Sequence, residues 1–92
     1  MSIIPLEVSN RNKDKQILRT GMIAELDTAS LYEQMADKAN TPQIKNILLG
    51  IAKEEKTHTG EFLHMLKEID KETEIELQKG SKEAEKLERV VM

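Results

Sequence analysis

Glu55 and His58 stand three residues apart in the segment EEKTHTGEF, residues 54–62. On a helix this spacing places a carboxylate and an imidazole on the same face, where both can reach one metal ion. Apolar residues flank the pair at steps of three and four, so the two ionisable side chains interrupt a stripe that a helix normally buries. The stripe consists of Ile44, Leu48, Ile51, Glu55, His58, Phe62, Met65 and Ile69. Because an unpaired buried carboxylate is costly, the pattern requires a compensating partner.

An earlier stripe also carries a carboxylate in its middle. It consists of Leu18, Met22, Glu25, Ala29, Tyr32 and Ala36. Glu25 and Glu55 lie about 15 residues before and after position 40, which is about 22 Å along each helix at about 1.5 Å per residue. If the chain folds back near position 40, both carboxylates and His58 return to one layer. The sequence therefore predicts that three potential metal ligands converge.

The elements that must position these side chains are two helices joined by a short turn. Helical periodicity runs from 12 to about 38 and from 42 to about 69. Between them, Asn40 or Thr41 is a suitable N-cap and Pro42 suits a first helical position. A connection this short favours an antiparallel hairpin, and no segment shows the alternation of a strand. The fold class is therefore all-α.

The two ends of the chain differ from this central hairpin, which spans residues 12–70. Residues 1–11 form an extended lead, because Pro5 disfavours a helix there. Residues 71–92 form a short helical tail in one or two pieces, with Gly80 as a stop and Ser81 as a new cap. The tail can dock on the hairpin or pack on a neighbouring chain.

Composition excludes several classes of function. The chain has 92 residues, no cysteine and a net charge of -3, with basic and acidic residues interspersed. It therefore carries no disulfide, no cysteine-bound zinc and no nucleic-acid footprint. No apolar run approaches the roughly 18 residues of a membrane span, so we expect a cytoplasmic protein. A domain this small needs a metal or a partner chain for stability.

Two copies of the hairpin would supply both the compensating partner for the buried carboxylates and the added stability that so small a domain needs. A four-helix di-iron site takes a Glu from each of two helices and a Glu-x-x-His from each of the other two. One chain supplies half of that set, and a two-fold homodimer supplies four carboxylates and two imidazoles. We therefore expect a four-helix bundle completed by dimerisation. Calcium, zinc or manganese can substitute for iron at such a site.

Residues 23–66 resemble the ferritin-like domain of the encapsulated ferritin family, and most closely the archaeal form fused to an encapsulin shell domain. The likeness rests on AELD and LYEQMA in the first helix, EEKTH in the second, and the spacing of Glu25 and Glu55. It implies a ferroxidase with a di-iron centre between subunits, with Glu25, Glu55 and His58 as ligands and Tyr32 close by. It also implies a decameric ring, a pentamer of dimers, inside an encapsulin nanocompartment. Leu31 stands where many members have Trp.

Other interpretations of the same residues stay open. Glu55 and His58 could form a structural hydrogen-bonded pair, and Tyr32 could be a core aromatic with a satisfied hydroxyl. His64, two positions beyond Phe62, is expected in solvent. Two further functions compete with the ferroxidase: a rubrerythrin-like peroxidase, which would need a separate electron donor, and a non-enzymatic, metal-stabilised helical assembly module.

Overall fold

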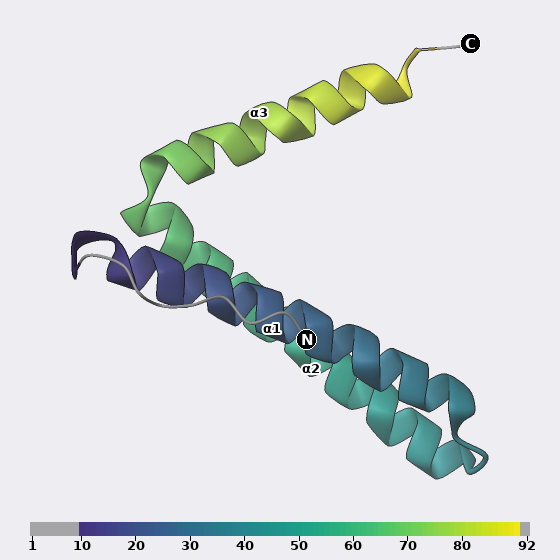
Figure 1. Cartoon of the computed structure of the whole chain (residues 1–92). Helices are drawn as coiled ribbons and strands as arrows, with labels where there is room; N and C mark the ends of the chain where they lie inside the picture. Colours follow the sequence, from purple (N-terminus) through teal and green to yellow (C-terminus); the bar gives the residue numbers. More distant parts are fainter. Residues whose placement is uncertain (1–9, 91–92) are drawn as a thin grey trace.

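A computed structural model of the chain describes residues 10–90 (Figure 1). These residues form three helices and no strand: α1 (Asn10–Lys38), α2 (Pro42–Ile69) and α3 (Lys71–Glu88). The predicted all-α fold is confirmed. Of the expected extended lead, residues 1–9 lie outside the described part, and Asn10 already belongs to α1. Not one of the three helices has the length and apolar character needed to cross a membrane.

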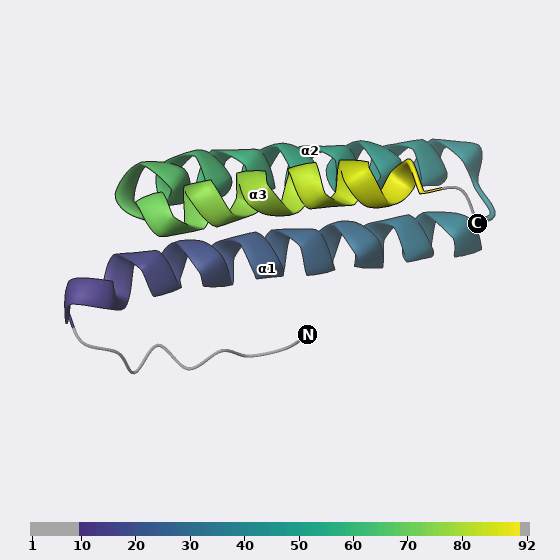
Figure 2. The same ribbon diagram turned by 90° about the horizontal axis from the view of Figure 1, so that it is seen from above.

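The first two helices form the predicted antiparallel hairpin, and they lie side by side in both views of the molecule (Figures 1 and 2). Pro42 begins α2, and Thr41 is its N-cap, with an extended backbone at φ -95° and ψ 122°. The Lys45 N–H donates to the Thr41 carbonyl over 3.0 Å, which closes the first turn of α2. Pro42 suits this position because the first helical N–H has no partner within the helix.

Small side chains make the contact between α1 and α2. Three alanines, Ala29, Ala36 and Ala52, are almost fully buried, and Leu66 is the one large apolar side chain among the described residues that is buried as deeply. Alanine at these positions lets the two helices approach closely, but it buries little apolar area. Many large apolar side chains therefore stay exposed on the single chain. The hairpin needs further cover to reach the stability expected of a folded domain.

The C-terminal tail is one continuous helix, so the prediction that Gly80 stops it is wrong. α3 passes through Gly80 and Ser81 without a break, and Gly80 does not adopt a positive φ. A helical glycine costs only about 1 kcal/mol relative to alanine, and no left-handed cap forms to end the helix here. α3 diverges from the hairpin in Figure 1, and all of its large apolar side chains are exposed.

A single residue, Asp70, separates α2 from α3. Its backbone N–H donates to the Leu66 carbonyl over 2.9 Å and ends α2, while its side chain caps α3. The Asp70 carboxylate accepts from the Thr73 N–H at 3.1 Å and the Thr73 hydroxyl at 2.6 Å. The Arg19 guanidinium of α1 donates to the same carboxylate over 2.8 Å. Asp70 therefore ties the base of α3 to both helices of the hairpin.

We expect the joint at Asp70 to lose stability in acid. Hydrogen bonds from Thr73, and then from Arg19, hold the pKa of Asp70 at about 2, below its ordinary value of 3.8. Because the folded pKa is the lower one, the stabilisation is complete above pH 3.8 and is lost as the pH falls towards 2. The Asp70→Asn variant should melt several degrees lower at pH 7, and its melting temperature should fall less over this acidic interval. Circular dichroism melts from pH 7 to 2 measure both, and parallel curves would contradict the assignment.

Candidate metal centre

Glu25, Glu55 and His58 come together where α1 and α2 run side by side. His58 Nδ1 lies 3.4 Å from Glu25 Oε2 and 3.8 Å from Glu55 Oε2. One ligand atom from each of the three residues lies within 4.8 Å of the other two. The hairpin thus brings together the three residues that the sequence singled out, because equal helix lengths on the two sides of the turn return them to one layer. Their role as metal ligands is a separate proposal.

The group is partly shielded and open on one side. The side chains of Glu25 and Glu55 are 22% and 19% exposed, whereas that of His58 is 45% exposed. Two carboxylates and one imidazole form a donor set that suits iron, manganese and zinc, and no cysteine is present to favour softer ions. Three residues leave part of the coordination sphere of such an ion unfilled. The arrangement is that of half a site, which a second set of ligands can complete.

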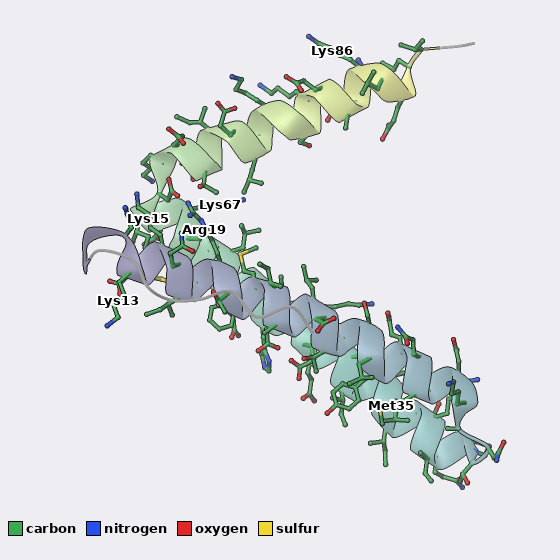
Figure 3. All side chains as sticks on the ribbon, in the orientation of Figure 1. Lys13, Lys15, Arg19, Met35, Lys67 and Lys86 are labelled. Carbon is green, nitrogen blue, oxygen red and sulfur yellow. The ribbon has the colours of Figure 1, made fainter. Side chains whose placement is uncertain are left out.

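The surface on which His58 opens is rich in apolar side chains. By helical spacing, exposed side chains from both helices lie on the same side of the hairpin as His58. We call this surface the metal face. Its exposed large apolar residues are Ile17, Leu31 and Met35 on α1, and Ile44, Ile47, Met65 and Ile69 on α2. In Figure 3, Met35 lies on the side of the hairpin away from α3, whereas Arg19 and Lys67 lie towards α3. The metal face is therefore not covered by the chain's own third helix.

Other residues discussed from the sequence fall outside the group of three. Tyr32 is half-buried on the Glu25 stripe, about 10 Å further along α1 towards the turn, so its closeness to the centre stays a prediction. His64 is exposed and lies 3.2 Å from Glu68, which confirms the expected solvated histidine. Glu54 and Glu61, which flank the stripe, are exposed as well.

Sequence reasoning missed an ion pair close to the centre. Lys56 Nζ of α2 donates to Glu33 Oε2 of α1 over 2.7 Å, and these residues directly follow Glu55 and Tyr32 in sequence. The pair links the two helices near the layer of the ligands, although both partners are half exposed and contribute little stability. No local signal could have revealed it, because the partners are far apart in sequence and oppositely charged residues are common throughout the chain.

Comparisons with known proteins extend this picture. The sequence profile of the family described as Rubrerythrin matches residues 16–91. The crystal structure of the encapsulated ferritin domain from Pyrococcus furiosus superposes with a TM-score of 0.85 at 37% identity, covering 100% of this chain and 99% of that one. The chain belongs to the encapsulated ferritins of the rubrerythrin family. The resemblance seen in the sequence is thereby confirmed.

A longer protein of the same archaeon is also similar to this encapsulated ferritin. The ferritin-like–encapsulin shell fusion protein of Pyrococcus furiosus is 46% identical over 72 residues. The match covers 78% of this chain but only 21% of that protein, so the chain spans about a fifth of the relative's length. Family membership supports iron chemistry in general terms, and the carboxylate and histidine group is the one place among the described residues with a suitable donor set.

Proposed function

We propose that this encapsulated ferritin is a ferroxidase that binds Fe(II) at Glu25, Glu55 and His58 and converts it to Fe(III). The observation that carries the proposal is the convergence of these three ligands within 4.8 Å on a partly shielded helix face. Membership of the rubrerythrin family supports iron as the ion. Calcium, zinc and manganese accept the same donors and would compete for the site.

The complete centre lies between two subunits in this proposal. One chain offers three ligand residues on an uncovered apolar face, and a two-fold axis through that face would bring a second set opposite the first. The paired hairpins would form a four-helix bundle with the ligand set of a di-iron site. The exposed apolar side chains around the ligands support this arrangement, because they stabilise the protein only when a partner chain covers them and removes them from water.

Each ligand has a definite part in the chemistry. Bound iron supplies the one-electron redox chemistry, with dioxygen or peroxide as the electron acceptor. The carboxylates of Glu25 and Glu55 bring negative charge and hard oxygen donors, which stabilise Fe(III) more than Fe(II) and so favour loss of the electron. His58 adds a neutral donor, and the partner's apolar face would exclude water and strengthen the attraction between carboxylates and cation.

The product needs a place to accumulate, and a shell supplies one. A Pyrococcus furiosus relative joins a ferritin-like part to an encapsulin shell part in one protein. We propose that this encapsulated ferritin likewise works within an encapsulin nanocompartment in the cytoplasm, which would store the oxidised iron. A decameric ring, a pentamer of dimers, needs a second interface besides the metal face, and the exposed apolar side chains of α3 are suited to one.

The family profile also favours a second candidate, a rubrerythrin-like peroxidase. Such an enzyme would return Fe(III) to Fe(II) with electrons from a donor protein. Because the chain contains no cysteine, it carries no cysteine-bound iron centre of its own, and the donor would be separate.

Fe(II) titration of the wild-type protein tests the proposal and separates the candidates. Under anaerobic conditions we expect binding to saturate at about two ions per pair of chains, with a rise in mass as the chains pair through the metal face. Stopped-flow absorbance should then show Fe(III) formation on addition of dioxygen or peroxide. A ferroxidase responds to dioxygen at least as fast as to peroxide, whereas a peroxidase responds mainly to peroxide. Absence of saturable binding would refute both.

A further inference from the structure

Phe62 and Gly21 lie against each other next to the candidate metal centre. Phe62 is one turn beyond His58 on α2, and Gly21 is one turn before Glu25 on α1. Because the helices are antiparallel, both positions fall on the same side of the ligands, away from the turn at residues 39–41. A methyl group added at Gly21 would lie 2.7 Å from Phe62 Cε1 and 2.8 Å from Cζ. The ring therefore reaches across to α1 and occupies the space that a side chain at position 21 would fill.

Other glycines of the chain show that this contact is special. A methyl group added at Gly50, Gly60 or Gly80 would meet nothing within 4 Å. Gly21 has an ordinary helical backbone, because no glycine of the described chain has a positive φ. Its backbone would therefore accept alanine, which favours a helix by about 1 kcal/mol. The three atoms nearest to a methyl group added at Gly21 all belong to Phe62, so the ring accounts for the absence of a side chain at this position.

Beyond the ring lies an apolar hollow. Phe62 lines a hollow of about 230 Å³ together with Leu18, Glu61 and Met65. Leu18 lies two turns before Glu25, and Met65 lies two turns after His58, so this hollow sits one layer further from the ligands than the ring. In the order of the layers, the ring stands between the hollow and the group of Glu25, Glu55 and His58.

We propose that Phe62, seated on Gly21, is a positioning residue that walls the metal centre on this side and keeps water from its carboxylates. The proposal rests on the ferroxidase site proposed above. Water raises the local dielectric and weakens the attraction between a carboxylate and a cation, so a ring fixed beside the ligands strengthens metal binding without touching the ion. Gly21 contributes because it has no side chain and so leaves room for the ring.

Cobalt(II) binding to the apo protein tests this without using the oxidation reaction. We expect Gly21→Ala to push the ring from its seat, weaken Co(II) affinity about ten-fold and alter the visible Co(II) spectrum. Gly60→Ala is the matched control, a glycine-to-alanine change in open space on the partner helix, and should leave both unchanged. If Gly21→Ala binds Co(II) like Gly60→Ala, the wall does not exist.

A double-mutant cycle isolates the pair. In a Phe62→Ala background, Gly21→Ala should cause no further loss of Co(II) affinity, because the ring it displaces is gone. Equal losses in both backgrounds would overturn the proposal. Phe62→Leu, which keeps apolar bulk but has no ring to reach Gly21, should also bind Co(II) about ten-fold more weakly, and it tests the wall with Gly21 intact.

The same Co(II) measurements distinguish a wrong assignment of the metal ligands from a wrong role for Phe62. If wild-type protein and Glu55→Ala bind Co(II) equally, the ligands are misassigned and the wall has nothing to shield. If Glu55→Ala abolishes binding but Gly21→Ala does not weaken it, the metal site stands and only the role of Phe62 is wrong. Thermal melts of each variant show whether a loss of affinity accompanies a loss of fold.

Discussion

Replacing Glu55 by alanine should lower the rate of Fe(II) oxidation by about a hundredfold or more. Loss of a group that merely supports a ligand already costs 10- to 100-fold in affinity or activity, and Glu55 is proposed to bind the ion directly. In a two-fold dimer the change removes two carboxylates at once. Oxygen consumption and Fe(III) absorbance after Fe(II) addition, with mass followed in parallel, measure the effect.

The neighbouring Glu54 gives a matched control for this experiment. Glu54 carries the same charge on the same turn of α2, but it is exposed and does not belong to the group of three. We expect Glu54→Ala to oxidise iron at a rate close to that of the wild type. Oxidation by Glu55→Ala at the wild-type rate would show that the site is misassigned.

Glu55→Ala should not unfold the apo protein. Oxygens of Glu25 and Glu55 lie within 4.8 Å of each other, so without a cation the two negative charges repel. Removing one of them relieves that repulsion, and we expect an unchanged or higher melting temperature in the absence of metal. Added Co(II) should raise the melting temperature of the wild type but not of the variant, because a ligand stabilises only the state that binds it.

Replacing Ile47 by glutamate should separate the proposed dimer and thereby abolish iron oxidation. Ile47 is 63% exposed on the metal face and lies about 12 Å along α2 from Glu55, too far to touch a bound ion directly. In a two-fold interface each copy would bury an unpaired carboxylate, which costs several kcal/mol and is counted twice. We expect a mass below that of the wild-type assembly and at least a hundredfold loss of oxidation rate.

Asn46 supplies the control for the interface experiment. It precedes Ile47 on the same helix, and the helical repeat points it away from the metal face. Asn46→Glu adds the same negative charge and should leave both mass and oxidation rate unchanged. If Ile47→Glu keeps the mass of the wild-type assembly and oxidises iron normally, the metal face is not the interface, and the second set of ligands must come from elsewhere.

Much of the hairpin follows from periodicity and turn chemistry. The step of three and four between apolar residues indicates both helices, and Pro42 after Thr41 marks the start of α2. The meeting of Glu25 with Glu55 and His58 follows from the rise per residue on equal lengths of helix. These features depend on residues within one or two helical turns of each other, or on the number of residues between each ligand and the turn. A sequence shows both directly.

Features that depend on particular side-chain contacts escaped prediction. Arg19 reaches Asp70 across 51 positions, and nothing near either residue announces the pair. Gly21 shows no local sign that Phe62 rests against it. The prediction that Gly80 stops a helix is wrong, because a glycine ends a helix only when the chain turns there, and α3 runs straight on. Local sequence signals indicate where a helix can begin or end, and long-range contacts determine which of these boundaries forms.

The one-residue joint at Asp70 gives the chain a mechanical property. α3 has 18 residues and acts as a rigid lever about 27 Å long, pivoted beside Arg19 and Thr73. A tilt of only about 10° at that pivot would displace the tip of the lever by about 5 Å, given a length of about 1.5 Å per residue. The position of any group that follows this tip in a longer protein, or packs against it, therefore depends on Arg19, Asp70 and Thr73 at the opposite end of the helix.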